Sequence, residues 1–389
     1  MTSNSVSETL LGLDALLTEE EREWQAKART FASQRVSPTI EKDFEDALFR
    51  REFVAELGAL GMLGMHLTGY GTAGANATSY GLVCYELEAA DTAWRTFVSV
   101  QGSLAMSALA YFGSDEQKER WLPSLAAGSS IGCFGLTEPT GGSDPAGMLT
   151  RATRSGDDWV LNGSKRWIGL GSVADVAIIW AQTDEGVRGF VVPTDTPGFR
   201  AENIESKHSL RASIQCDLFF DNLRLPASAQ LPEARGLSAP FLCLNDARYG
   251  IVWGVMGAAR DCLDVAIERS KTRLAFGKPI GAMQLTQLKL ADSFVEYEKG
   301  MLLALHLAKL KDAKALTPEQ ISVGKLNNVR EAIRIASTAR SILAGDGITG
   351  DFSVMRHMNN LESVRTYEGT DEIHTLVLGR ALTEQGAFR

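Results

Sequence analysis

The sequence has none of the patterns that mark a disulfide-stapled domain or a zinc site. It has five cysteines in 389 residues, an odd number; no pair forms a CxxC motif, and none has a histidine at zinc-ligand spacing. We therefore expect reduced thiols packed as small hydrophobic side chains, a cytoplasmic protein and no metal site. The cysteines are Cys84, Cys133, Cys216, Cys243 and Cys262.

Two further absences restrict the partners. Lys and Arg number 39 against 48 Asp and Glu, a net charge of −9 with no basic stripe, so we expect no nucleic acid partner. No apolar run approaches the roughly 18 residues that cross a bilayer. The first residues show no basic segment followed by an apolar stretch. We therefore expect no membrane segment and no secretory signal.

The chain is long, and its pattern of apolar residues changes twice along the sequence. A length of 389 residues exceeds one compact core. Helical periodicity dominates up to residue 131, short β-branched runs between Gly, Pro, Asn and Asp occupy 132–240, and helical periodicity returns over 241–389. The sequence predicts a multi-domain α and β protein with an N-terminal helical domain, a middle antiparallel β domain and a C-terminal helical bundle.

Helix signals are clearest at the two ends of the chain. Thr18 to Glu21 reads as a capping box that opens a helix. Gly254, Gly257 and their small neighbours would let helices approach closely. The expected helices cover 18–36, 47–60, 80–89, 97–111, 115–126, 246–273, 283–311, 318–343 and 372–382. In the middle, Asn162-Gly163 between two apolar runs predicts a hairpin with a type I′ turn.

Three polar segments are unusual for a purely structural protein, and each also has an ordinary interpretation. Residues 133–144 concentrate hydroxyls and glycines, as in a ligand-wrapping loop or an inter-domain turn. Residues 343–348 end a long helix with two glycines, as in a C-cap or a surface that a ligand approaches. In residues 367–374, Thr370 or Asp371 can cap a helix, which leaves Tyr367 and Glu368 without a structural explanation.

Together these segments make the chain resemble the acyl-CoA dehydrogenase family over about residues 16–388, and within it the glutaryl-CoA dehydrogenases. The matching segments are 132–144, Arg211-Ala212-Ser213, 245–250, 273–277 and 367–370. The resemblance implies bound FAD and oxidation of an acyl-CoA between Cα and Cβ. It also implies a homotetramer that passes electrons to an electron-transfer flavoprotein.

The resemblance also implies the roles of individual residues. Glu368 matches the catalytic base, and Tyr367 matches the residue beside the base in decarboxylating members. Positions that match substrate contacts are Arg95, Ser99, Glu88, Asn245, Arg248 and Ser143. Positions that match cofactor contacts are Phe134, Leu136, Thr137, Ser143, Trp167, Ile168, Gly169, Gly345, Thr370 and Glu372, with Arg273, Phe276 and Gln284 reaching the FAD of a neighbouring subunit.

The expected substrate depends on Arg95. The segment 88–99 matches the glutaryl-type pattern, in which an Arg and a Ser four residues later hold the distal carboxylate. Their i, i+4 spacing puts Arg95 and Ser99 on one helical face, and Glu88 lies on the same face and could orient Arg95. Taken from the residues alone, an exposed Arg95 that pairs with Asp91 is the alternative. With the resemblance, we expect glutaryl-CoA to be oxidised and decarboxylated to crotonyl-CoA and CO₂.

One departure from the family pattern keeps other functions open. Many relatives carry Thr where this chain has Gly169, and some oxidase-like relatives share the Trp-Ile-Gly pattern. A short-chain acyl-CoA oxidase and a non-decarboxylating glutaryl-CoA dehydrogenase are therefore alternatives. A flavin-free helical scaffold is the alternative from outside enzymology.

Overall fold

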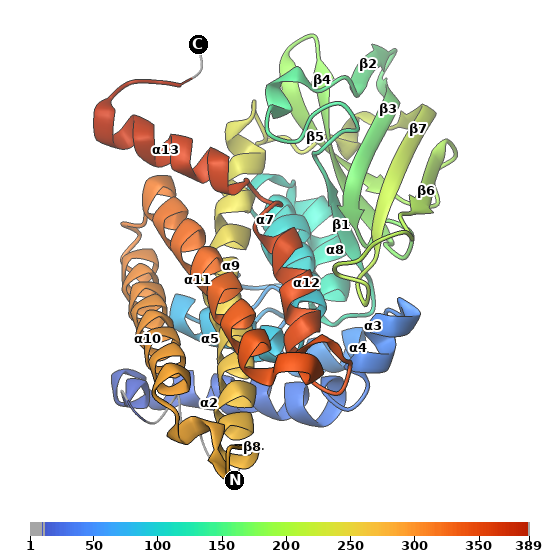
Figure 1. Ribbon diagram of the computed structural model, residues 1–389. Helices are drawn as coiled ribbons and strands as arrows, with labels where there is room; N and C mark the ends of the chain where they lie inside the picture. Colours follow the sequence, from blue (N-terminus) through green and yellow to red (C-terminus); the bar gives the residue numbers. More distant parts are fainter. Residues whose placement is uncertain (1–9, 11, 388–389) are drawn as a thin grey trace.

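The structure, a computed structural model, describes residue 10 and residues 12–387. The N-terminal and C-terminal helices pack against each other, and a β region built from the middle of the chain lies on one side of them (Figure 1). The predicted order of helices, β region and helices is confirmed. The strands of the middle region begin with β1 at Gly132, and the C-terminal helices begin with α9 at Ser238. The ends of the predicted outer domains, 1–9, 11 and 388–389, lie outside the described residues.

The N-terminal helices open with the predicted capping box. The Thr18 amide donates to Glu21 Oε2 at 2.8 Å, and the Glu21 amide donates back to Thr18 Oγ1 at 3.3 Å. Two backbone donors at the start of α2 are thereby satisfied. The elements of this part are η1 Leu13–Leu16, α2 Glu19–Phe31, η2 Ala32–Val36, α3 Ile40–Asp46, α4 Glu52–Ala59, α5 Ala77–Ala90, α6 Thr92–Val98, η3 Ser99–Met106, α7 Ser107–Phe112 and α8 Asp115–Ala126.

The helix predicted over 47–60 is wrong at its start. The helix α4 begins only at Glu52, and residues 47–51 separate it from α3, with Ala47 in a left-handed conformation of φ 53°. The Arg50 guanidinium turns back onto the buried Asp43 carboxylate at 2.6 Å, which fixes the chain between α3 and α4. The apolar residues 53, 57 and 60 share a helical face, but periodicity does not reveal where that helix begins.

The middle sheet is mixed, so the prediction of an antiparallel β domain needs correction. β1 pairs in parallel with β4, and β2 also meets β4 in parallel, whereas the remaining pairs are antiparallel. Side-chain alternation carries no information on strand direction, which the crossover connections decide. The order is β1-β4-β2-β3-β7-β6, with β5 on β4. The strands are β1 Gly132–Gly135, β2 Arg151–Ser155, β3 Asp158–Gly169, β4 Val176–Thr183, β5 Gly186–Pro193, β6 Phe199–Asn203 and β7 Gln215–Leu225.

The hairpin predicted at Asn162-Gly163 is also wrong. Both residues lie inside the continuous strand β3, where the pairing with β7 shifts register. A Cβ at Gly163 would lie 2.7 Å from the Cα of Thr150. The glycine therefore serves a close backbone approach rather than a turn. The β2–β3 turn instead lies at Gly156-Asp157.

The C-terminal helices follow the prediction more closely. The predicted helices over 246–273, 283–311, 318–343 and 372–382 are present, the first of them extended at its start, and α12 is an additional helix that the sequence reading missed. Short 3₁₀ turns lie in the middle region, η4 Pro145–Gly147 and η5 Ala227–Ala229, and η6 Ile280–Ala282 follows the small β8–β9 hairpin. The elements here are α9 Ser238–Thr272, β8 Leu274–Ala275, β9 Lys278–Pro279, α10 Gln284–Asp312, α11 Pro318–Leu343, η7 Ala344–Ile348, α12 Val354–Val364 and α13 Asp371–Thr383.

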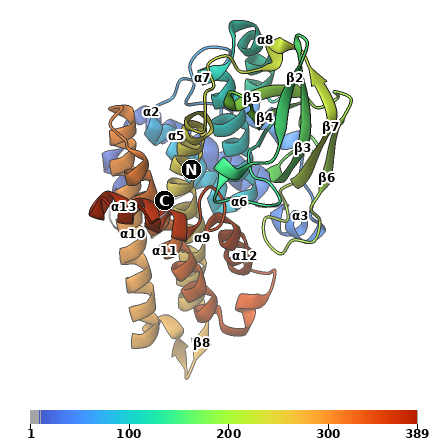
Figure 2. The same ribbon diagram turned by 90° about the horizontal axis from the view of Figure 1, so that it is seen from above.

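The long helix α9 runs through the molecule and packs against α5 on one side and α11 on another (Figure 2). The predicted close approach is present, because a Cβ at Gly257 would lie 1.9 Å from the Tyr85 carbonyl oxygen of α5. The five cysteines are buried free thiols, as predicted. Among the described residues, no helix is long and apolar enough to cross a membrane.

Candidate active site

The turn between α12 and α13 carries Glu368. Its backbone adopts a left-handed conformation with φ 55°, which is uncommon for a residue with a side chain. Thr370 caps α13, because its Oγ1 accepts a hydrogen bond from the Ile373 amide at 3.3 Å. Glu368 Oε2 is buried and has no hydrogen-bond partner among the described residues. The turn therefore directs into the protein a carboxylate that has one oxygen without a hydrogen bond.

Burial and nearby charges have opposite effects on the pKa of Glu368. Burial raises the pKa of its carboxyl, whereas the positive charges of Arg95, Lys325 and Arg248 lower it, and the pKa stays above its ordinary value. A carboxylate in this condition is a stronger base than one in water, and it can hold a proton once it has accepted one.

Arg95 on α6 is completely buried beside this carboxylate. Its Nε donates to Glu88 Oε2 at 2.5 Å, and its Nη2 donates to the Tyr367 hydroxyl. The alternative of an exposed Arg95 paired with Asp91 is wrong, since Asp91 instead accepts from the Arg356 Nε at 2.9 Å. Burial raises the pKa of Tyr367 to about 12, so its hydroxyl keeps its proton.

Two further atoms at this place lack partners. Among the described residues, Arg95 Nη1 and Ser99 Oγ are buried without a hydrogen bond, as is Glu368 Oε2. Ser99 stands one helical turn after Arg95, as predicted, at the point where α6 continues into η3. Buried polar atoms without partners are costly, so this group has unused capacity to bind a polar ligand.

Arg248 and Asn245, on α9, approach the same turn. Arg248 Nε donates to the Glu368 carbonyl oxygen at 2.7 Å, and its Nη1 donates to Asn245 Oδ1 at 3.3 Å. The structure thus brings together Glu368, Tyr367, Arg95, Glu88, Ser99, Arg248 and Asn245 from five places in the sequence. In the described part of the chain, no group of three or more His, Cys, Asp or Glu side chains could hold a metal ion.

The edge of the β sheet faces this cluster. The Gly132 amide at the start of β1 donates to Gln101 Oε1 of η3 at 2.8 Å. A Cβ at Gly169, the last residue of β3, would lie 3.3 Å from Val100 Cγ2, next to Ser99. The ends of β1 and β3 therefore border the same helical segment as the polar cluster.

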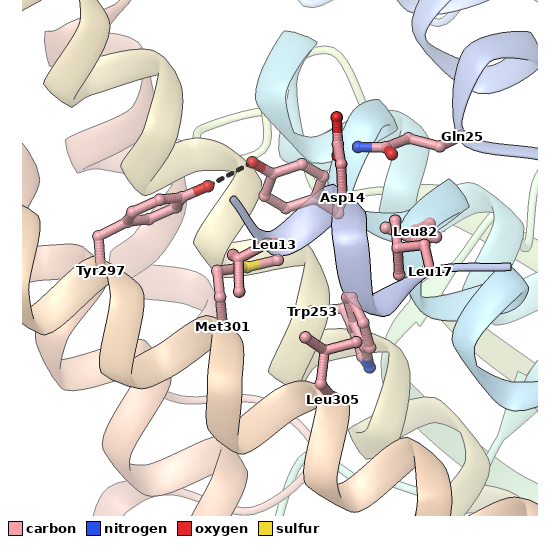
Figure 3. Close-up of a pocket in the computed structure, with 10 residues that line it drawn as sticks. Leu13, Asp14, Leu17, Gln25, Leu82, Trp253, Tyr297, Met301 and Leu305 are labelled. Carbon is pink, nitrogen blue, oxygen red and sulfur yellow. Dashed lines mark hydrogen bonds between the residues drawn. The ribbon is translucent and has the colours of Figure 1, made fainter. Parts of the chain in front are cut away.

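A small cavity elsewhere is unrelated to this chemistry. It has a volume of ≈ 20 Å³ and lies between η1, α5, α9 and α10, lined by Leu17, Trp253 and Met301 among others (Figure 3). The Tyr85 and Tyr297 hydroxyls meet beside it at 2.5 Å. None of the predicted site residues lines it, so we place the active site at Glu368.

Comparison with known sequences identifies the family. The descriptions "Acyl-CoA dehydrogenase, N-terminal domain", "Acyl-CoA dehydrogenase, middle domain" and "Acyl-CoA dehydrogenase, C-terminal domain" match residues 18–129, 133–223 and 234–383, which together span most of the chain. The chain belongs to the acyl-CoA dehydrogenase family.

Several relatives of this acyl-CoA dehydrogenase are similar along most or all of their length. Glutaryl-CoA dehydrogenase from Mycobacterium smegmatis has 61% identity and a TM-score of 0.98, covering 99% of this chain and 100% of the other. A glutaryl-CoA dehydrogenase from the same organism in complex with FADH2 has 59% identity, the same TM-score and the same coverage. The human mitochondrial short-chain specific acyl-CoA dehydrogenase is 34% identical over 90% of this chain and 87% of its own.

The predicted cofactor residues of this acyl-CoA dehydrogenase fall into two groups. The first surrounds the sheet edge: Phe134, Leu136 and Ile168 are buried, Thr137 and Gly169 are half-buried, and Ser143 is exposed in the following loop. Trp167 is 53% exposed and has a φ of 63°, so a large aromatic face stays uncovered beside the cluster. Aromatic, hydroxyl and backbone groups at one sheet edge fit a planar polar cofactor such as a flavin.

The second group lies at the opposite end of the helical bundle. Arg273, Phe276 and Gln284 flank or belong to the β8–β9 hairpin, which is far from the sheet in both views (Figures 1 and 2). Phe276 is 97% exposed. Gly345 is at this end too, because its neighbour Asp346 pairs with Arg269 in the last turn of α9. The structure does not bring this group to the sheet edge of the same chain.

Thr370 and Glu372, at the start of α13, complete the cofactor predictions. Thr370 is half-buried as the helix cap, and Glu372 is exposed, with the pKa of its carboxyl lowered mainly by the Thr370 hydroxyl. The structure therefore gives Thr370 a capping role and leaves Glu372 at the surface.

Sequence reading missed two lysines of this acyl-CoA dehydrogenase. Lys165 is buried in β3 and donates to Glu138 Oε1 at 2.8 Å and to the Leu136 carbonyl oxygen at 3.0 Å. This pair fixes the loop that follows β1. Lys325, on α11, reaches the Glu368 turn. The available signal was a lysine among apolar residues at a buried helical or strand position, which is rare without a partner.

Proposed function

We propose that this protein is an FAD-dependent acyl-CoA dehydrogenase that oxidises glutaryl-CoA between Cα and Cβ. The observation that carries the proposal is Arg95, which is completely buried near Glu368 and whose Nη1 lacks a hydrogen bond, as does the hydroxyl of Ser99 one helical turn later. An apolar acyl chain would leave Arg95 Nη1 and Ser99 Oγ without hydrogen-bond partners, whereas the distal carboxylate of glutaryl-CoA can accept from both. The name of the relative at 61% identity supports the same substrate.

FAD would be held at the sheet edge. The residues that would hold it are Phe134, Leu136, Thr137, Trp167, Ile168 and Gly169. FAD supplies the two-electron oxidation, as the relative in complex with FADH2 supports. Glu368 removes the α-proton of the thioester. Its raised pKa and its buried, unpartnered Oε2 suit this task. Arg95 and Ser99 hold the far end of the substrate so that the α-carbon stays near the base.

The same residues support decarboxylation to crotonyl-CoA. Oxidation makes the distal carboxylate vinylogous to the thioester, so loss of CO₂ leaves a stabilised dienolate. Glu368, now protonated, returns its proton to Cγ, and crotonyl-CoA is released. Tyr367, hydrogen-bonded to Arg95, keeps its proton at neutral pH and stands where the departing carboxylate is bound.

The test is anaerobic mixing of the purified yellow protein with glutaryl-CoA. We expect bleaching of the flavin absorbance and crotonyl-CoA as the product by mass. An unbleached flavin overturns the proposal, and glutaconyl-CoA as product would establish the non-decarboxylating alternative.

Gly169 favours a second candidate, the short-chain acyl-CoA oxidase. Rapid reoxidation of the reduced protein by O₂ would establish it.

We further propose an electron-transfer flavoprotein as acceptor, a homotetramer and a cytoplasmic location. The distance between the two cofactor groups supports oligomerisation, since Arg273 and Phe276 can serve a neighbouring subunit's FAD. An exposed apolar stripe along α10 supports it as well, formed by Leu285, Leu288, Val295 and Leu302. Five buried free thiols suit a reducing compartment.

A further inference from the structure

Cationic side chains hold the Glu368 turn at three successive carbonyl groups. The Lys325 ammonium donates to the Tyr367 carbonyl oxygen at 2.7 Å and to the Gly369 carbonyl oxygen at 2.6 Å. Arg248 donates to the carbonyl oxygen between them, that of Glu368, at 2.7 Å. The two cations come from different helices, α11 and α9, so two helices bind the turn through hydrogen bonds.

These hydrogen bonds act where the backbone is strained. Glu368 has the positive φ that side chains disfavour, and such a conformation persists only when its surroundings over-determine it. Hydrogen bonds from charged donors are the strongest available for this purpose. Without them the turn could relax and swing the carboxylate away from its direction in the structure.

Lys325 is an unusual residue for a merely structural role. It is 2% exposed, and among the described residues no carboxylate oxygen lies within ion-pair distance of its ammonium, which donates to carbonyl groups instead. Burial lowers its pKa to about 7. A neutral side chain of the same length would fill this space at lower cost, so the position favours a function for the cation.

We propose that Lys325 is a positioning residue, which holds the Glu368 carboxylate toward the substrate by clamping the peptide carbonyls on both sides of it. This inference rests on the proposed role of Glu368 as the base. It assigns Lys325 no contact with the substrate and no proton transfer.

The clamp also has an electrostatic consequence. Positive charge on Lys325 lowers the pKa of Glu368, as do Arg95 of α6 and Arg248 of α9. Among the described residues, the other titratable groups that face this place are Tyr367, Asp371, His374, Glu88 and Cys84. Removal of the Lys325 charge therefore raises the pKa of Glu368, and the pH at which flavin reduction becomes half-maximal moves upward.

The test compares Lys325→Met with Asn328→Leu in the full-length, FAD-loaded protein. Asn328 is a matched control because it lies one turn further along α11 and also bridges two carbonyl oxygens, those of Val252 and Gly300, without contacting the turn. We expect Lys325→Met to slow flavin reduction by glutaryl-CoA about 100-fold, as misplacement of a catalytic group does. The pH of half-maximal flavin reduction should rise, and the affinity for glutaryl-CoA should change little. Asn328→Leu should lower the melting temperature and leave the rate and pH profile near wild type.

A second readout needs no activity. Hydrogen exchange of peptides covering residues 366–371 should quicken in Lys325→Met, with and without FAD, and not in Asn328→Leu. Should the Met variant not fold, Lys325→Arg is compared with Lys325→Gln. Flavin reduction by glutaryl-CoA should be roughly tenfold faster in Lys325→Arg than in Lys325→Gln, because a hydrogen bond from a charged donor is stronger than one from a neutral donor by about this factor.

Several results would overturn the clamp. These are a Lys325→Met rate within threefold of wild type, an equal loss in Asn328→Leu, or equal rates for Lys325→Arg and Lys325→Gln. Failure of the proposed function gives a different result from failure of the clamp. The wild-type flavin would then stay unbleached with glutaryl-CoA, whereas the hydrogen-exchange comparison would still test the clamp.

Discussion

At the level of single residues, the site depends on buried charged groups that each keep one atom without a hydrogen bond. Glu368 Oε2 and Arg95 Nη1 are both buried, and both lack hydrogen bonds among the described residues. A stable protein tolerates such atoms where binding completes them. In the proposed mechanism the two groups have separate roles, because the carboxylate acts at the reacting end of the substrate and the guanidinium binds its anionic end.

Replacement of the base should separate folding from chemistry. We expect Glu368→Gln to fold and stay yellow and to lose at least about 10³-fold in flavin reduction, since general base catalysis contributes on the order of 10²–10⁴. Glu362→Gln is the control, because Glu362 is an exposed carboxylate on α12 that pairs with Arg365. Stopped-flow absorbance measures both variants, and substantial turnover by Glu368→Gln would contradict its assignment as the base.

Replacement of the guanidinium should change substrate preference. We expect Arg95→Gln to lose about 100-fold or more in kcat/KM for glutaryl-CoA, the effect of about 3 kcal/mol for an unpaired charge, and far less for butyryl-CoA. Arg356→Gln removes another buried arginine, one that pairs with Asp91, and should not discriminate between the two substrates. An equal loss on both substrates in Arg95→Gln would remove the carboxylate-binding role.

At the level of elements, α5 and α9 hold the Arg95–Glu88 pair between them. α9 contributes Gly254, and a Cβ there would lie 2.1 Å from Glu88 Oε2 and 3.1 Å from Arg95 Cγ. The space for the ion pair therefore depends on the absence of one methyl group from the neighbouring helix. Close helix packing and substrate recognition meet at this glycine.

A methyl group at this contact should disturb both. We expect Gly254→Ala to destabilise the protein by about 2 kcal/mol or more, because overpacking displaces a buried ion pair. Glutaryl-CoA turnover should fall with it. Gly379→Ala on α13 is the control, since no atom lies within 4 Å of the added Cβ, and there alanine should be neutral or slightly stabilising. Thermal melting compares the two, and an unchanged melting temperature for Gly254→Ala would contradict the packing explanation.

At the level of the whole molecule, buried neutral histidines tie stability to pH. Burial lowers the pKa of His66 to about 4 and that of His374 to about 3. In the unfolded chain both titrate near 6.5. Between these values the unfolded chain binds protons that the folded chain does not, so acid favours unfolding.

We therefore expect stability to fall as the pH drops from about 6.5 toward 4, by up to about 1.4 kcal/mol per pH unit for each histidine that stays neutral when folded. Melting temperatures measured from pH 7 to pH 5 at constant ionic strength test this. His374→Asn should flatten the profile. A wild-type melting temperature that stays constant over this range would contradict the burial of neutral imidazoles.

The sequence by itself determined the order of helices, sheet and helices and the capping box at Thr18, and it predicted a cap at Thr370 or Asp371 and a site that includes Glu368 and Arg95. These features are local patterns or motif matches, which follow from neighbours along the chain. The small-residue face of α9 was also readable, because close helix contacts need residues without bulk.

Only the tertiary structure decided how distant segments meet. The parallel pairing of β1 with β4 and the close approach of Gly163 to Thr150 depend on partners outside the local segment. The Lys325 clamp belongs to the same class, since its ammonium reaches carbonyl oxygens more than forty residues away. Side-chain periodicity reports which face of an element is buried, but it carries no information on which element covers that face, and that choice created the charged interior of this site.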